Sequence, residues 1–217
     1  MNEINKNKQT TNILEKMAYY DKQPIAEGNQ FFEFVTNHQP HDNEKLHSST
    51  QVTGKNGEKL YHHIFVNKNT DISKDNQYDV HHILSSNKDP RQPGVAAGLA
   101  VHYNNVNVNT ATGIKNVPSG GVIDGIRVAD VNNRGKGYGP QIFHNMAHHH
   151  GALIGDKDYS SEGESLVNKM SKHPAYDFTP DTQQPIEEAH DPTKGTRSIF
   201  SLKDVSKTGK IPNKFLG

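Results

Sequence analysis

The segment from Val128 to Gly139 combines residue types and spacings that are typical of an anion-binding site. An apolar strand is predicted to end at Val128, and an amphipathic helix is predicted directly after Gly139. The turn between them contains three glycines: Gly135, Gly137 and Gly139. Glycines let backbone N–H groups converge, and a helix N-terminus adds further N–H donors and the positive end of its dipole. With the charges of Arg134 and Lys136, the segment is suited to bind a diphosphate.

A tight strand-to-helix turn without a ligand would have the same pattern. Two common phosphate-binding motifs are excluded, because no Lys-Ser/Thr pair follows the glycines and because the dinucleotide fingerprint needs one more residue between its second and third glycines. Pro140 also removes one N–H donor, although proline is well accepted at the first position of a helix. The glycines alone therefore leave both interpretations open.

The spacing Arg134-x-x-Gly137-x-Gly139 resembles the Arg/Gln-x-x-Gly-x-Gly/Ala signature of the GNAT acyltransferases. The predicted order of strand, loop, helix, short strand and helix around it is similar to that of the family, and the resemblance covers about residues 60–205. It implies a mixed sheet whose fourth and fifth strands splay apart. It also implies acetyl-CoA, or another acyl-CoA, as cosubstrate and an amine as acyl acceptor.

The resemblance further implies where the cosubstrate is held. Its pantetheine arm would pair with the backbone of the fourth strand, and its pyrophosphate would lie on the amides of residues 136–139. The cofactor-binding residues implied in this way are Ile126, Arg127, Val128, Arg134, Gly135, Lys136, Gly137, Tyr138, Gly139 and Ser161.

Attack of an amine on a thioester is helped by a general base and by an acid that protonates the leaving thiolate. Asp124 lies on the predicted fourth strand, where relatives often place an acidic residue; a plain carboxylate on the sheet surface is the alternative. Many relatives carry the acid as a Tyr in the helix after the fifth strand, but Val167 stands at that position here. We predict Tyr159, just before that helix, as its substitute.

The histidines suggest two other chemistries. His144 and His148 are spaced i, i+4 on a predicted helix, as two metal ligands could be, but basic residues are also favoured at a helix C-terminus and no metal site is predicted. The segment Asp79-Val80-His81-His82-Ile83 is similar to the start of an HNH nuclease motif, in which a His activates water beside a metal. Ordinary strand histidines are the favoured interpretation of this segment.

The surrounding pattern predicts an α/β (α+β) domain: a GNAT-like mixed, mostly antiparallel sheet flanked by helices, with splayed central strands. Strands are predicted at 60–66, 78–85, 95–103, 121–128, 152–155, 176–178 and 198–202, and helices at 141–148 and 160–170. The polar stretch 104–119 is expected to be a long loop. The predicted organisation is a polar, partly ordered N-terminal extension (1–58), an acyltransferase domain (59–205) and a C-terminal tail (206–217).

Composition limits the classes of function. With 24 Lys and Arg against 24 Asp and Glu, the chain is not a strongly basic nucleic-acid binder, and the absence of Cys excludes disulfide, thiolate-zinc and cysteine-nucleophile chemistry. No apolar run approaches the roughly 18 residues of a membrane span. We expect a cytoplasmic protein, or one carried in a phage particle, that acts on an amine-bearing small molecule or protein. An assembly partner could hold residues 1–58.

Two functions of other classes remain as alternatives. One is a non-catalytic structural or interaction protein, possibly associated with a phage virion, that keeps the acyltransferase fold; the substitution at Val167 favours it. The other is an HNH-type metal nuclease built on the histidine pairs.

Overall fold

A computed structural model describes residues 43–128, 133, 135–155, 161–182 and 195–203. Eight strands form one sheet in the order β1-β2-β3-β4-β5-β6-β8-β7, and two helices accompany it in the described part of the chain. All neighbouring strands are antiparallel except β5 and β6. The predicted mixed α+β class with a mostly antiparallel sheet is therefore confirmed.

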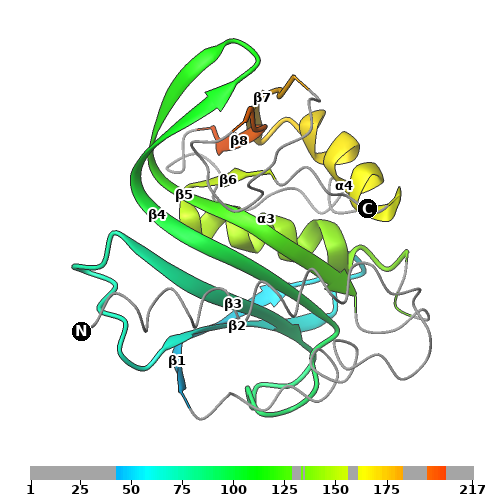
Figure 1. Ribbon diagram of the computed structural model, residues 1–217. Helices are drawn as coiled ribbons and strands as arrows, with labels where there is room; N and C mark the ends of the chain where they lie inside the picture. The colour runs from blue at the N-terminus through cyan, green and yellow to red at the C-terminus, as the bar shows by residue number, and fades with distance from the viewer. Residues whose placement is uncertain (1–42, 129–132, 134, 156–160, 183–194, 204–217) are drawn as a thin grey trace.

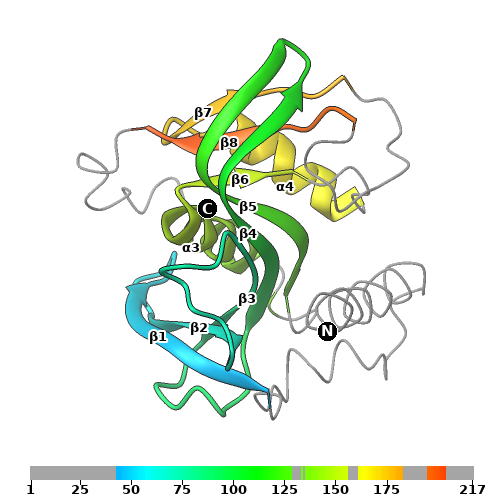
Figure 2. The same ribbon diagram turned by 60° about the vertical axis from the view of Figure 1, so that its left-hand side comes forward.

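The first half of the sheet is an antiparallel meander (Figures 1 and 2). Its strands are β1 (Glu44–Thr53), β2 (Lys59–Asn67), β3 (Gln77–Ser85), β4 (Ala96–Thr110) and β5 (Gly113–Val128). Strands β3 and β4 form an antiparallel hairpin that pairs from Gln77 opposite Tyr103 to Leu84 opposite Ala96.

A helix crosses over between the two halves of the sheet. After β5 come α3 (Tyr138–His150), β6 (Ala152–Ile154), α4 (Ser161–Ser171), β7 (Tyr176–Thr179) and β8 (Ile199–Leu202). Because β6 follows a helical crossover, it can lie parallel to β5, which a tight hairpin would not allow.

Both described helices pack on the same face of the sheet. The main core lies there and joins Ile142, Phe143 and Met146 of α3 to Leu60, Leu84 and Ala100 of β2, β3 and β4, and to Leu153 and Phe200 of β6 and β8. From α4, Met170 is buried in the same core and Leu166 packs against it. The core thereby fixes the position of α3 across five strands.

The predicted loop at 104–119 is wrong, because these residues are the outer half of the β4–β5 hairpin. The strands pair as far as Thr110 opposite Gly113, with a two-residue turn between them. The many asparagines suggested a loop, yet Val106, Val108 and Val117 are buried against Val122, Ile154 and Ile199 on the sheet face opposite α3. Alternation of valine and polar residues therefore produced a half-buried hairpin.

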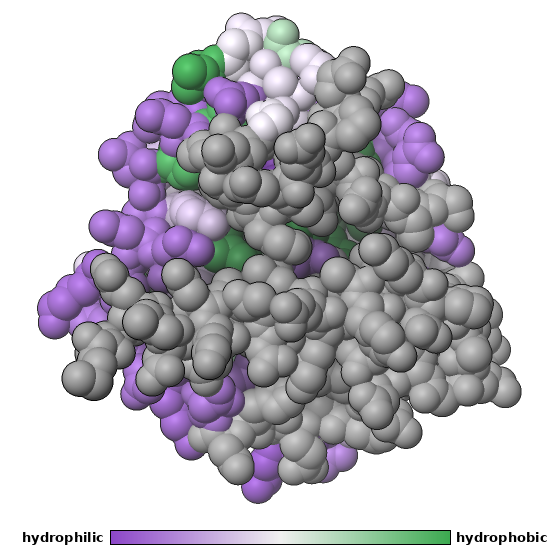
Figure 3. Space-filling view, in the orientation of Figure 1, coloured by the Kyte–Doolittle hydropathy of each residue, from purple (hydrophilic) through white to green (hydrophobic). Residues whose placement is uncertain are grey.

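The tip of this hairpin extends past the rest of the sheet, as Figures 1 and 2 show. On the face seen in Figure 3, most of the coloured surface is hydrophilic, and hydrophobic residues are visible near the tip and at a few places below it. Ile114, 73% exposed, lies in this part of the hairpin.

The predicted boundary at residues 58 and 59 falls inside the β1–β2 hairpin. Residues 44–53, expected in the polar extension, form β1 and pair with β2 along their whole length. The polar sequence of β1 is consistent with an edge strand that is mostly exposed. The sheet therefore begins at Glu44, and residues 1–42 lie outside the described part of the chain.

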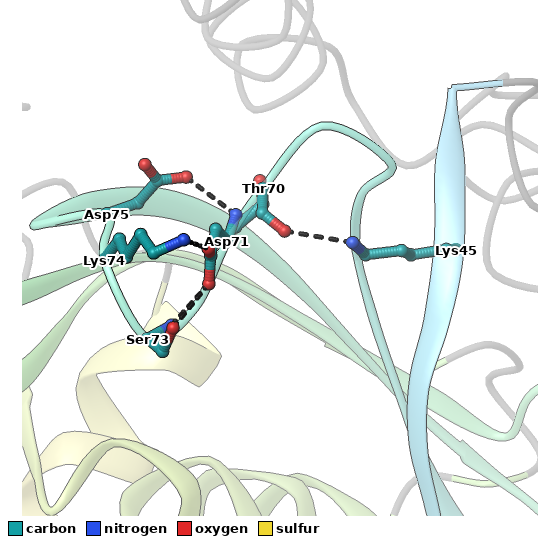
Figure 4. Close-up of polar contacts among 6 residues, drawn as sticks. All are labelled: Lys45, Thr70, Asp71, Ser73, Lys74 and Asp75. Atoms are coloured by element: carbon teal, nitrogen blue, oxygen red, sulfur yellow. Dashed lines mark hydrogen bonds and ion pairs between the residues drawn. The ribbon is translucent and has the colours of Figure 1, made fainter.

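The connection between β2 and β3 is held by a local polar network (Figure 4). Asp71 accepts hydrogen bonds from the backbone N–H and the hydroxyl of Ser73 and pairs with Lys74 at 2.9 Å. Lys45 of β1 donates to the carbonyls of Lys68 and Thr70. These contacts tie the edge strand to the connection.

None of the described helices is long and apolar enough to cross a membrane.

Candidate functional site

Strands β5 and β6 pair over only two positions, Gly121 with Leu153 and Val122 with Ile154. Beyond them β5 continues to Val128 with β4 as its one strand neighbour within the described chain. Along one edge of β5, from Ile123 to Val128, no strand of the described part of the chain pairs with it. Asp124 lies at the start of this stretch, in a bulge: Ala100 is opposite Ile123 and Leu99 is opposite Gly125, so that Asp124 has no opposite residue.

The glycine-rich turn then leads into α3. Gly135 and Gly137 have φ values of 77° and 86°, in the left-handed region that favours glycine. Gly137 is the N-cap residue, no side chain in the described part of the chain caps the helix, and the first turn contains no acidic residue. Lys136 is exposed and its Nζ donates to the side-chain oxygen of Asn133 at 2.9 Å. An uncapped helix N-terminus beside a lysine is suited to an anion.

The model places some of the predicted binding residues together and leaves others undescribed. Ile126 and Val128 pack against the main core on the α3 face, and Arg127, between them on β5, has its side chain on the opposite face. Tyr138 also packs against the main core, and the Cβ of a substituted Gly139 would lie 3.9 Å from the side chain of Val128. Arg134 and Tyr159 lie outside the described residues. Ser161 begins α4, and its side chain is not described.

Asp124 belongs to a polar cluster that the sequence did not predict. Asp124 of β5, His81 of β3 and Glu44 of β1 all act electrostatically on Asp79 of β3, and His81 also contacts Glu44. His81 Nδ1 lies 2.6 Å from Glu44 Oε1, and both side chains are largely buried, at 6% and 11% exposure. We call these four residues the acidic cluster.

The carboxyl group of Asp79 is largely buried within the acidic cluster. Burial raises its pKa above the usual value, and the charges of Asp124 and Glu44 raise it further, while His81 lowers it. A carboxylate with a raised pKa is a better proton acceptor near neutral pH. Alternation along β3 puts Asp79 and His81 on one face, and this period of two was the signal available in the sequence.

Val167 of α4 is partly buried and packs against the main core. An apolar residue in this place cannot donate a proton. The helix therefore supplies no acid from this position.

The strand histidines are divided between two environments. His82 faces α3 and hydrogen-bonds to His62 and His150. Its neighbour His81 lies on the other face of the sheet, where it belongs to the acidic cluster. Among the described residues, no three His, Cys, Asp or Glu side chains are arranged to hold a metal ion. His144 and His148, the two histidines spaced i, i+4 on the helix, have ring centroids 4.4 Å apart. His144 Nδ1 is 2.6 Å from the hydroxyl of Tyr176.

The chain was compared with family models, with curated proteins and with solved structures, and none of them matches it.

Proposed function

We propose that this protein is an acyl-CoA-dependent N-acyltransferase with a GNAT-like domain, and that it transfers an acetyl group from acetyl-CoA to an amine. The observation that carries the proposal is the short pairing of β5 and β6. Within the described residues the two parallel strands do not pair beyond Val122 and Ile154, while β5 continues to Val128, a few residues before the N-terminus of α3.

The order of elements also supports this proposal. The resemblance of the sequence implied splayed fourth and fifth strands at 121–128 and 152–155, joined by a helix. These segments correspond to β5 and β6, the parallel pair. A second helix and an antiparallel pair of strands then complete the sheet. The proposed domain includes β1 and so starts before residue 59.

The residues present fit acyl-CoA as a ligand. The edge of β5 along which no described strand pairs is suited to accommodate a pantetheine arm near Ile126, Arg127 and Val128. The N-terminus of α3 and Lys136 are suited to the pyrophosphate. An extended ligand that contacts both places would have its thioester end toward Asp124.

At that position the acidic cluster can supply the base. An amine must be neutral to attack the thioester carbonyl, and Asp124 or Asp79 can accept its proton, directly or through water. The new C–N bond forms as the C–S bond breaks, and the thiolate takes up a proton. Tyr159 is our proposed source of this proton. The acceptor is an amine-bearing small molecule or protein in the cytoplasm.

The non-catalytic alternative is supported by one observation, the apolar contact of Val167 with the core. A protein of this kind would bind CoA without turning it over.

Isothermal titration with CoA tests the binding step. We expect binding to wild type, and about tenfold or greater weakening in Lys136→Glu, because a negative charge replaces a positive one beside the diphosphate. The matched control is Lys172→Glu, an exposed lysine after the C-terminal end of α4, which should bind as wild type does.

Release of CoA thiol with a panel of amines then separates the two candidate functions. Thiol release that depends on the amine supports the acyltransferase, whereas binding without release supports the non-catalytic alternative. If folded wild-type protein shows no binding at millimolar CoA, the proposal is wrong.

A further inference from the structure

Four buried histidines form a continuous hydrogen-bonded chain between α3 and the sheet. His62 Nε2 lies 3.0 Å from His82 Nδ1, His82 Nε2 lies 3.0 Å from His150 Nε2, and His150 Nδ1 lies 2.8 Å from His102 Nδ1. His102 Nε2 is 3.1 Å from the side-chain oxygen of Asn104. The rings come from β2, β3, α3 and β4, and we call them the imidazole chain.

Asn104 fixes the direction of every hydrogen bond in this chain. Its side-chain NH₂ donates to the carbonyl of Asp75, so its oxygen faces His102 and requires a hydrogen on His102 Nε2. His102 Nδ1 is then an acceptor, and His150 must donate from Nδ1. In turn, His82 and His62 must donate from Nε2. All four rings are neutral, and His150 is the one ring of the chain that carries its hydrogen on Nδ1.

This arrangement limits how many protons the closed chain can bind. When one proton is added, every hydrogen bond of the chain can be kept, because the terminal rings of His62 and His102 can then both donate away from the chain. This proton nevertheless places a positive charge in a buried site. A second proton puts two N–H groups face to face in one of the links. The closed structure therefore loses a hydrogen bond when it binds a second proton.

The surroundings do not offset a positive charge. The charges that act on the chain come from other histidines, and burial is the largest influence on each ring. Burial lowers the pKa of His62 to about 3 and depresses the pKa of His82 and His150 strongly. Other titratable side chains around the rings are His47 of β1, His63 of β2, Tyr78 and His81 of β3, and His149 of α3. The carboxylate of Asp75 acts on Tyr78.

The imidazole chain also joins the C-terminal end of α3 to the sheet. His150 is the last residue of α3, it is fully buried, and its two ring nitrogens bond to strands β3 and β4. The rings of His62 and His82 are nearly parallel, at an interplanar angle of 11°, and their hydrogen bond extends the connection to β2. We propose that the imidazole chain is an acid-triggered latch, which fastens the C-terminal end of α3 to β2, β3 and β4 while its rings are neutral and releases that end when two or more protons bind.

The latch would act whatever reaction the protein catalyses, and its first test needs no substrate. Long-range ¹H–¹⁵N spectra of wild type at pH 7.5 should show four neutral rings, with His150 protonated at Nδ1 and His62, His82 and His102 at Nε2. A different tautomer at His150, or a charged ring in the chain, would overturn the proposal.

Hydrogen exchange measures the release. After correction for intrinsic rates, the opening constant for amides of residues 146–151 should rise at least about 100-fold per pH unit below 6.5, because each proton taken up contributes a factor of ten. A rise of tenfold or less per pH unit contradicts the latch.

Asn104→Asp tests the His102 end of the imidazole chain. The new carboxylate would compensate a positive charge on the ring of His102. His102 should then hold a proton in the closed state, and the opening constant should rise about tenfold less steeply per pH unit than in wild type. The control is Asn107→Asp, an exposed residue on the same strand that does not bond to the chain and should behave as wild type. If the opening constants of the two variants depend on pH in the same way, the proposal is overturned. It is also overturned if added Zn²⁺ increases the protection of these amides from exchange, because the imidazole nitrogens would then be metal ligands.

Discussion

At the scale of single residues, Asp124 occupies an irregular backbone position in the proposed site. It occupies a bulge in β5, at the start of the edge that β6 leaves free, and its charge acts on the pKa of Asp79. Bulges commonly re-aim one side chain next to an active site. The predicted alternative, a plain surface carboxylate, would not require such a position.

We expect Asp124→Asn to lower the rate of acyl transfer by about 10²–10⁴, the usual contribution of a general base. CoA affinity should stay near the wild-type value, and the pH–rate profile should shift to lower pH, because removal of this charge lowers the pKa of Asp79. Asp177→Asn, a change of the same kind on β7 with the carboxylate mostly exposed, is the control. Equal rates for wild type and Asp124→Asn would remove Asp124 from the mechanism.

At the scale of elements, α3 connects the two features that we propose to be functional. Its N-terminus is the candidate anion site, and its C-terminal residue His150 is part of the imidazole chain. Close packing against β5 holds the C-terminal end in place. A Cβ at Gly121 would lie 2.6 Å from two ring atoms of His150, so only glycine leaves room for this ring.

Gly121→Ala should therefore destabilise the protein by about 1–3 kcal/mol through overpacking. The ring of His150 cannot move freely because both of its nitrogens are hydrogen-bonded. Urea unfolding at pH 8, where the histidines are neutral, measures the effect. In the control Gly139→Ala, whose Cβ would have an ordinary contact of 3.9 Å, stability should be unchanged or higher by up to about 1 kcal/mol. A Gly121→Ala protein as stable as wild type would show that the contact is not tight.

At the scale of the whole molecule, the buried histidines make stability depend on pH. Among the described residues, nine histidines have a pKa lowered mainly by burial: His62, His63, His82, His102, His144, His148, His149, His150 and His173. The folded state binds fewer protons than the unfolded state once the pH falls below about 6.5, the usual histidine value. Stability is therefore complete above this pH and decreases as the pH falls.

For the four most buried of these with large shifts, His62, His82, His144 and His150, the slope should be about 5 kcal/mol per pH unit, from about 1.4 kcal/mol for each proton. The window extends downward from pH 6.5 toward the folded-state values of about 3 for His62 and His144. Since folded proteins are stable by only about 5–15 kcal/mol, we expect unfolding between about pH 5.5 and 4. Urea unfolding curves from pH 8 to pH 5 measure the slope, and a flat free energy of unfolding over this range would contradict the expectation.

The sequence by itself determined the local elements. Short runs rich in apolar and aromatic residues placed β2 and β3, and an amphipathic segment after a glycine-rich turn placed α3, within a few residues of their observed ends. Such patterns depend on neighbours a few residues away, so they can be predicted from a single chain. The hairpin at 104–119 was missed because its many asparagines hid an alternation of valines that become buried only against β5, β6 and β8.

Only the tertiary structure decided which polar groups meet. His82 and His150 are 68 residues apart, and Glu44, Asp79 and Asp124 come from three strands, two of them separated by β4. The sequence showed pairs of histidines but not that one ring of each pair enters the same buried chain. Their contacts depend on the register of the strands and on the position of α3. Register and helix position are set by burial of the whole core, which no local pattern contains.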